Sequence, residues 1–306
     1  MFVKELRLNP VSPFNFNLSM QIFKSGDRQI RVYENGVFRQ AVRLSDKLVL
    51  VELESAGTVE LPLLLAQLKT DREFTSADAK EAATIITRLL NLDLDLTAFY
   101  ATAKRDETLE GVTKQLWGLR SPTTQTIHEA LMDSIVEQQI SLKIANTMER
   151  RIIKNFGEAL MLGEDVYYAY PTPAALANAD ADKLRGCGLS QRKAEYMRQI
   201  SALIAEGKLD LEKFRSYDST ERIISELDAV RGIGKWTAEL TIIRSLQRWD
   251  ALPADDIGLR RILSHFYRGG EKITSEEAKK IAEPWGRWRG LAAYYFVVAE
   301  LMGLDG

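Results

Sequence analysis

The chain has 306 residues, 45% of them hydrophobic and 27% charged, with a formal net charge of −2 at pH 7. This size and composition are typical of a globular protein with a substantial core, and they exclude fibrous and low-complexity chains. The single cysteine excludes an internal disulfide framework and an iron–sulfur cluster held by four cysteines of the chain. The two histidines argue against a histidine-rich metal site.

No stretch approaches the roughly 18–20 consecutive apolar residues that a helix needs to cross a bilayer. The first residues, MFVKELRLNPVSPF, contain no long apolar segment followed by a small-residue cleavage site. We therefore expect no membrane association and no secretion, so the reducing cytoplasm is the expected compartment.

Residues 1–100 predict a small α/β domain. The segment 29–44, QIRVYENGVFRQAVRL, has two alternating runs around Asn35-Gly36, a dipeptide typical of a tight β-hairpin. The segment 47–55, KLVLVELES, predicts a further strand, and residues 75–92 have apolar side chains at helical spacing. We expect a few antiparallel strands covered by at least one helix.

Residues 101–306 predict a second, all-helical domain, with strands ending near residue 104. Apolar residues recur at helical spacing through residues 126–157. Two later segments, 180–207 and 219–246, each predict a helix, a short glycine-containing turn and a second helix. The expected fold class is α+β, with an antiparallel-sheet domain followed by a helical domain.

Residues 227–240 in the last of these segments read LDAVRGIGKWTAEL. Gly232 and Gly234 permit positive φ or close backbone approach, and Ile233 between them can fill an apolar floor. The helix that begins near Lys235 leaves its first N–H groups unpaired beside the turn, where they favour an anion such as phosphate. Because Gly-x-Gly also commonly connects helices, the spacing alone leaves a purely structural role open.

This hairpin, followed by a Pro-containing segment and the acidic pair Asp255-Asp256, resembles the helix-hairpin-helix (HhH-GPD) DNA glycosylase superfamily. Within it, the chain looks most like the 3-methyladenine DNA glycosylase II (AlkA-like) branch. The segment 127–141, IHEALMDSIVEQQIS, is similar to the family's central helix with its Gln-rich turn, and residues 170–197 are similar to the segment that follows. Residues 12–23, SPFNFNLSMQIF, resemble the aromatic opening of the N-terminal domain.

The resemblance implies a TBP-like N-terminal domain at residues 1–100 and a two-lobed helical glycosylase domain at residues 101–306. It assigns the hairpin to sequence-independent contact with the DNA backbone. The residues implied in that contact are Val230, Gly232, Ile233, Gly234, Lys235 and Thr237. By position, the backbone carbonyls of Val230 and Ile233 would hold a monovalent cation. Such contacts depend on backbone geometry, so a net charge of −2 does not argue against them.

The resemblance also implies a catalytic aspartate. In the family this residue is followed by alternating apolar positions and commonly a basic residue, a frame that Asp256, with Arg260 four residues later, fits best. Its implied role is to stabilise positive charge at the sugar C1′ as the base leaves and to orient or deprotonate the attacking water. Asp255 remains the alternative, and its structural interpretation is a helix cap before Ile257.

Trp236 occupies the position where bifunctional relatives carry a Schiff-base lysine. Since tryptophan forms no imine, the resemblance implies a monofunctional enzyme, with Lys235 facing phosphate. Trp288 matches a second pocket tryptophan, with Trp285 as its rival, and aromatic faces attract cationic alkylated purines. Both tryptophans have core packing as the alternative role. The remaining pocket candidates are Leu240, Phe14 and Phe16.

Gln138 and Gln139 lie at the turn that, in the family, sends a side chain into the base stack. Gln139 is the predicted wedge and Gln138 its partner, although both could be surface residues without such a role. Residues 257–292 hold eight Lys or Arg against four Glu, which is a local basic excess. We expect Cys187, His128 and His265 to be structural.

The sequence therefore predicts a monofunctional alkylpurine DNA glycosylase of base excision repair, acting as a monomer on damaged double-stranded DNA without a cofactor. Its expected location is at the nucleoid, or in the nucleus of a eukaryote. One rival is an oxidised-purine glycosylase with lyase activity, which would have to use Lys235 because position 236 carries no lysine. The other is a DNA-binding protein of the same fold without catalysis.

Overall fold

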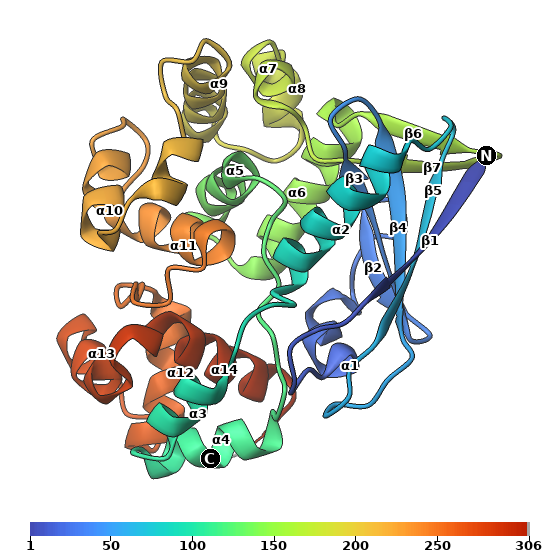
Figure 1. Ribbon diagram of the computed structural model, residues 1–306. Helices are drawn as coiled ribbons and strands as arrows, with labels where there is room; N and C mark the ends of the chain where they lie inside the picture. The colour runs from blue at the N-terminus through green and yellow to red at the C-terminus, as the bar shows by residue number, and fades with distance from the viewer. Residues whose placement is uncertain (305–306) are drawn as a thin grey trace.

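A five-stranded antiparallel sheet forms the N-terminal part of the protein (Figure 1), as seen in a computed structural model that describes residues 1–304. The strands lie in the order β1-β5-β4-β3-β2, so that β2 to β5 form a meander and β1 pairs with β5 at one edge. In chain order they are β1 (Phe2–Leu8), β2 (Arg31–Glu34), β3 (Val37–Arg43), β4 (Leu48–Ser55) and β5 (Leu64–Thr70).

The predicted hairpin and its strands are confirmed. Asn35 and Gly36 connect β2 to β3 with φ of 53° and 81°, the left-handed backbone that this two-residue turn requires. β4 is buried on both faces: Val49, Val51 and Leu53 point to one core, and Leu48 and Leu50 point to another. A strand buried on both sides reads as the continuous apolar run seen in the sequence.

Helices cover one face of the sheet and a second hairpin covers the other. The helices are α1 (Phe16–Ser19), η1 (Gln21–Phe23) and α2 (Ser76–Leu90). The predicted helix is confirmed as α2, whose N-terminus is closed by a capping box between Thr75 and Asp78. On the other face, Leu160 and Leu162 pack against Leu48 and Leu50.

These last contacts come from strands that the sequence analysis did not predict. β6 (Ala159–Leu162) and β7 (Asp165–Tyr168) form an antiparallel hairpin within the part expected to be all-helical. The expectation that strands end near residue 104 was therefore wrong for this hairpin. Four-residue strands carry little local signal, and these two are stabilised by burial against the N-terminal sheet.

The helical part has two lobes with separate cores, and the α+β class is confirmed. The middle lobe contains the helices α5 (Ile127–Glu137), α6 (Leu142–Phe156), α7 (Pro173–Ala177), α8 (Ala181–Gly186), α9 (Gln191–Ala205), η2 (Glu212–Ser216), α10 (Thr220–Asp228) and α11 (Lys235–Leu246). The segment 126–157 is thus two helices, α5 and α6, separated by a turn after Glu137.

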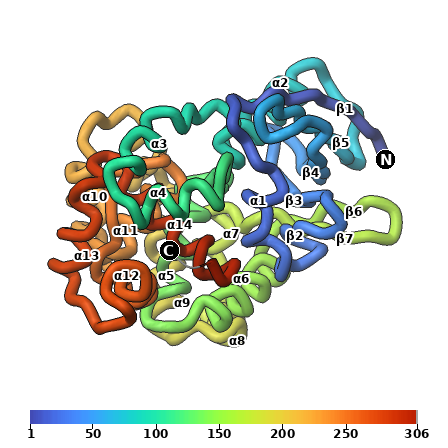
Figure 2. Tube along the Cα trace, turned by 90° about the horizontal axis from the view of Figure 1, so that it is seen from below, coloured from blue at the N-terminus to red at the C-terminus, as the bar shows by residue number. Residues whose placement is uncertain are grey.

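The C-terminal lobe joins the last helices to two earlier ones. It contains α3 (Thr97–Ala103), α4 (Glu107–Gln115), α12 (Ile257–Arg268), α13 (Ser275–Ala282), η3 (Glu283–Trp288) and α14 (Arg289–Leu301). Figures 1 and 2 both show α3 and α4 beside the C-terminal helices, and the boundary expected at residue 100 falls inside α3. Among residues 1–304, no helix is long and apolar enough to cross a membrane.

Arg120 connects the N-terminal part to the helical part by hydrogen bonds. Its side chain is fully buried, and its guanidinium donates to the carbonyl oxygens of Val11 (2.7 Å), Pro13 (3.1 Å) and Leu94. Burial lowers the pKa of this guanidinium from its usual value, and no carboxylate of the described residues forms an ion pair with it. Carbonyl oxygens therefore make the direct contacts that compensate its desolvation, while Asp93 and Asp95 act on its charge from a greater distance.

Replacing Arg120 by alanine should lower the free energy of unfolding by about 3 kcal/mol, because three partly buried carbonyls lose their donor and a cavity forms. Urea unfolding of the variant against the wild type measures this. Arg105→Ala, which removes an exposed arginine of the neighbouring segment, should change it by about 0.5 kcal/mol or less. Equal effects of the two substitutions would contradict the role given to Arg120.

Candidate active site

The predicted hairpin is present between α10 and α11. Its turn closes with the Ile233 N–H donating to the Val230 carbonyl (3.0 Å), and Ile233 is buried in the middle lobe. Gly232 has φ of 101°, and a Cβ atom there would lie 2.5 Å from the ring of Tyr196. The glycine is therefore required twice, by its backbone angle and by the aromatic ring against which it packs.

Tyr196 comes from α9, the second helix of the preceding helix–turn–helix segment. Its hydroxyl accepts a hydrogen bond from Nε of Arg192 (2.7 Å), which lowers the pKa of the phenol. The guanidinium of Arg231 lies 6.0 Å from the ring centroid. The two helix–turn–helix segments thus pack against each other through this ring, with two arginines at its edge.

The N-terminus of α11 is open. Gly234 is its N-cap, with no side chain capping the helix, and Lys235 is exposed. This leaves the first N–H groups of a 12-residue helix directed out of the turn, as an anion site needs. The carbonyl of Val230 already accepts one N–H and retains a second lone pair, so cation binding there remains a prediction.

Asp256 lies at the first turn of α12 and is held from two sides. Its Oδ1 accepts the N–H of Leu259 (2.7 Å), and its Oδ2 accepts the indole N–H of Trp236 (2.9 Å). The first bond makes Asp256 the N-cap of α12, and the second joins it to the hairpin helix α11. Gly258 leaves room beside this carboxylate, since a Cβ atom there would lie 3.0 Å from Oδ1.

The interpretation of Asp255 as the helix cap is corrected by this geometry. Asp255 is exposed, and its Oδ1 accepts a hydrogen bond from the hydroxyl of Ser275 at the start of α13 (2.6 Å). The cap and the candidate catalytic carboxylate are therefore the same residue, Asp256. A carboxylate that accepts hydrogen bonds from both a helix N-terminus and an indole has a fixed orientation, which suits a catalytic group.

Two of the five predicted pocket residues lie on the helix that carries the hairpin. Trp236 and Leu240 are half-buried and one helical turn apart on α11. Trp288 is 8% exposed and packs against Phe99, with the guanidinium of Arg287 4.9 Å from its ring centroid. Its rival Trp285 is fully buried and donates its indole N–H to Asp106, so it is a core residue.

Phe14 and Phe16 are placed away from any base pocket. Both are 2% exposed and pack with Tyr33 in the core between the sheet and its helices. The expectation that they line the pocket is not supported, because their rings are enclosed in the N-terminal core. Their role is to join the short helix α1 to the sheet.

The Gln-rich turn has two distinct glutamines. Gln138 donates from Nε2 to the Gly232 carbonyl (3.2 Å) and to the Thr237 hydroxyl (3.0 Å), so it braces the hairpin. Gln139 is exposed, with φ of 58°, an unusual backbone angle for a non-glycine residue. This geometry presents the Gln139 side chain outward from a strained, fixed turn, as the predicted wedge requires.

Two further residues, Lys193 and Arg244, stabilise this turn, and neither was predicted from the sequence. Lys193 donates to the carbonyls of Val136 (2.8 Å) and Gln138 (2.6 Å), and burial lowers the pKa of its ammonium. Arg244 on α11 forms an ion pair with Glu137 (2.8 Å). Sequence spacing gives no signal for these pairs, because their members lie far apart along the chain.

The remaining polar candidates have structural surroundings. Arg260 is half-buried and donates to the Ile273 carbonyl (3.4 Å), so a DNA contact by its side chain remains a prediction. Cys187 and His128 are buried as expected, and burial lowers the pKa of His128 to about 4. Within residues 1–304, no group of three or more His, Cys, Asp or Glu side chains could hold a metal ion.

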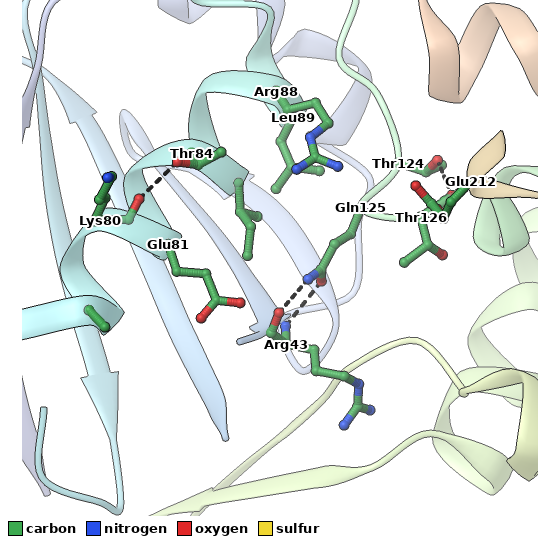
Figure 3. Close-up of a pocket in the computed structure, with 12 residues that line it drawn as sticks. Arg43, Lys80, Glu81, Thr84, Arg88, Leu89, Thr124, Gln125, Thr126 and Glu212 are labelled. Atoms are coloured by element: carbon green, nitrogen blue, oxygen red, sulfur yellow. Dashed lines mark hydrogen bonds between the residues drawn. The ribbon is translucent and has the colours of Figure 1, made fainter. Parts of the chain in front are cut away.

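A cavity of about 540 Å³ lies elsewhere, between α2 and the segment 124–126. Figure 3 shows the side chains of Arg88 and Glu81 directed into it, opposite Gln125. None of the predicted site residues is part of its lining. The hairpin and Asp256 therefore form the candidate site on chemical grounds, since they bring together an acid, an aromatic ring and an open helix terminus.

Comparison with known proteins agrees with this geometry. Residues 132–287 match the family described as HhH-GPD superfamily base excision DNA repair protein. The chain belongs to the HhH-GPD superfamily. Residues 19–131 match the family described as 8-oxoguanine DNA glycosylase, N-terminal domain. As a member of the superfamily, this protein is a DNA glycosylase of base excision repair, and DNA is its partner.

Individual relatives cover most of the chain. A DNA-3-methyladenine glycosylase of Bacillus subtilis is 27% identical over 265 residues, which are 86% of each chain. A 3-methyladenine DNA glycosylase structure from Archaeoglobus fulgidus is 27% identical, with a TM-score of 0.84 over 97% of this chain and 99% of that one. An 8-oxoguanine glycosylase/lyase of Clostridium acetobutylicum in complex with DNA is 19% identical with a TM-score of 0.75, covers 99% of each chain and shares the fold.

Within this HhH-GPD domain, Gly232→Ala should lower the free energy of unfolding by about 2–4 kcal/mol and weaken DNA binding. The new Cβ would meet the Tyr196 ring at 2.5 Å, at a φ that side chains rarely adopt. Gly234→Ala is the matched control for stability, because its Cβ would meet open space. Thermal unfolding compares them, and a Gly232→Ala variant as stable as Gly234→Ala would refute the packing argument.

Proposed function

We propose that this protein is a monofunctional DNA glycosylase that releases alkylated purines of the 3-methyladenine and 7-methylguanine type. The hydrogen bond from the Trp236 indole to the Asp256 carboxylate (2.9 Å) carries the proposal. It brings the residue at the position of the family's lyase lysine into contact with the candidate catalytic acid. Because this residue is tryptophan, water is the attacking group.

The chemistry follows from one carboxylate and a charged leaving group. The bond from the sugar C1′ to the base nitrogen breaks, and its electron pair leaves with the base. An alkylated purine is cationic and leaves as a neutral base, so no acid has to protonate it. Asp256 stabilises the positive charge that grows at C1′, water adds there, and the water's proton passes to the carboxylate or to solvent.

Two tryptophans support the choice of substrate. Trp236 is half-buried on the hairpin helix, where it contacts the acid, and Trp288 is 8% exposed in the C-terminal lobe. Electron-rich indole faces attract cationic bases more strongly than neutral ones. Relatives named DNA-3-methyladenine glycosylases at 27–30% identity point to the same class of lesion.

The target nucleotide has to leave the duplex before this chemistry, and the hairpin and the Gln-rich turn supply the means. The open N-terminus of α11 and the Lys235 side chain contact the backbone phosphates, while Gln139 enters the gap left by the flipped base. An amide side chain there can hydrogen-bond the orphaned partner base. The enzyme acts as a monomer without a cofactor, at the nucleoid or in the nucleus.

Asp256→Asn should reduce the rate of 7-methylguanine release from alkylated DNA by about 10²–10⁴-fold while retaining DNA binding, because the fixed negative charge is lost and the cap is kept. Single-turnover base release measures the rate, and gel shift measures binding. Asp255→Asn is the matched control and should stay within about threefold of wild type. Full activity of Asp256→Asn would exclude its catalytic role, and an enzyme without base release would favour the non-catalytic rival.

The match of residues 19–131 to the 8-oxoguanine glycosylase N-terminal domain supports a second candidate, an oxidised-purine glycosylase with lyase activity. This candidate needs an amine that attacks C1′, and Lys235 is the nearest lysine in sequence to the acid-bound Trp236. The Lys235 side chain is more than half exposed, and on a helix it points roughly 100° away from that of Trp236.

Borohydride should trap no covalent complex between the wild type and a duplex carrying 8-oxoguanine or an abasic site, since no lysine is positioned at C1′. A glycosylase/lyase assayed in parallel verifies the trapping conditions. Trapping by the wild type that disappears in Lys235→Ala would establish lyase chemistry and overturn the monofunctional assignment.

A further inference from the structure

Glu239 is a buried carboxyl group beside the proposed DNA contact. It lies on α11, one helical turn after Lys235, and its side chain is 7% exposed. Its Oε1 is 3.9 Å from the Lys235 ammonium, and its Oε2 is buried without a hydrogen-bond donor among the described residues. A buried carboxylate oxygen without a donor is energetically unfavourable, so stabilisation of the fold does not explain the position of Glu239.

The charges around Glu239 come from three elements. Lys235 lies on α11 itself, Asp255 lies in the segment before α12, and Lys279 lies on α13. Asp255 accepts a hydrogen bond from Ser275, and Lys279 forms an ion pair with Glu276. Glu239 therefore lies on α11 on the side that faces charges of the C-terminal lobe, with Lys235 as its only ion-pair partner among residues 1–304.

These surroundings leave Glu239 close to a change of charge near neutral pH. Burial and, to a smaller extent, the charge of Asp255 raise the pKa of its carboxyl, and Lys235 and Lys279 oppose the rise, with a net pKa of about 7. At physiological pH both the ionised and the neutral forms are therefore populated.

We propose that Glu239 is a positioning residue for Lys235: its ionised carboxylate holds the ammonium back along α11, and its neutral form frees Lys235 to contact a DNA phosphate. The inference rests on the proposed function, in which Lys235 faces the DNA backbone. DNA binding then becomes coupled to uptake of a proton by Glu239, a property that the hairpin motif alone does not have.

The sign of the coupling follows from charge. A bound duplex brings phosphates toward Lys235 and removes the cation that favours ionised Glu239, so DNA raises the carboxyl pKa further. By linkage, the protonated protein binds DNA more tightly, and affinity falls as pH rises through about 7. Each unit by which DNA raises the pKa corresponds to about tenfold in affinity.

The test measures the affinity of the full chain for a short duplex with a tetrahydrofuran abasic-site analogue, at fixed salt, between about pH 6 and 8.5. The wild type should bind roughly three- to tenfold more tightly at the acid end. Glu239→Gln should bind at all pH values as the wild type does at the acid end, because glutamine is a neutral isostere. Glu276→Gln removes the same charge from an exposed position on α13 and should keep the wild-type pH profile.

A double substitution separates positioning from bulk charge. In the Lys235→Ala background, Glu239→Gln should no longer change the affinity, since the side chain through which it acts is gone. The same gain in both backgrounds would overturn the proposal, and so would a wild-type affinity that does not vary with pH. The second result needs no variant, so a folding defect of Glu239→Gln cannot mask it.

Other groups that titrate in this range lie elsewhere. Burial also raises the pKa of Glu129 to about 7, but Glu129 lies in the first turn of α5, where it faces Arg31 of β2 in the N-terminal sheet. A pH dependence caused by Glu129 would persist in Glu239→Gln and would count against the proposal. Base release by the wild type, measured in parallel, tests the proposed function separately: normal release without pH-linked binding refutes only the role of Glu239.

Discussion

The hydrogen bond between the Trp236 indole and the Asp256 carboxylate joins two lobes that otherwise have separate cores. Trp236 lies on α11, the helix that follows the hairpin turn in the middle lobe. Asp256 is the N-cap of α12 in the C-terminal lobe. The connecting segment is anchored as well, because the Gly290 N–H of α14 donates to the Trp249 carbonyl (2.6 Å). The position of the acid relative to the hairpin is thus determined by both lobes at once.

The hairpin is also the support of the Gln-rich turn. Gln138, directly after α5, donates a hydrogen bond to the backbone of the hairpin, and Lys193 of α9 donates one to the carbonyl of Gln138. Tyr196, three residues after Lys193, fills the space that Gly232 leaves open. A change in the hairpin would therefore displace the acid, the turn and the open N-terminus of α11 together. The geometry of the site therefore depends on the backbone that the glycines permit more than on the charged side chains around it.

Local patterns predicted the parts of the molecule whose cause is local. The Asn35-Gly36 turn, helix α2 and the hairpin all have signals within a few residues. The choice of Asp256 over Asp255 came from the resemblance to the family and stays a prediction, although Asp256 is the residue that contacts Trp236. The β6–β7 hairpin could not be predicted in this way, since its strands depend on burial against the sheet. Phe16 was placed in the wrong environment because an aromatic residue in the sequence does not indicate which core it enters.

The shifted pKa of Glu239 could not be predicted from the sequence either. In the sequence it is an ordinary glutamate of a helix that also carries Lys235, and such pairs are commonly solvated. The structure buries it where α11 meets the C-terminal lobe, so a residue that would contribute little on a surface acquires a shifted pKa. Charge counted along the chain therefore misses the property on which the proposed pH dependence rests, which is the charge state of one carboxyl group beside one lysine.

Trp236 combines two requirements at one position. Its N–H orients the acid, and in the proposed function its lack of an amine leaves water as the attacking group. A lysine at this position could supply an amine, but it could not supply the rigid, planar N–H donor of an indole. Other residues would then have to orient the Asp256 carboxylate. The choice between hydrolysis and lyase chemistry is thus tied to how the carboxylate is held. A change of chemistry at this site would require compensation around Asp256 and not a single substitution.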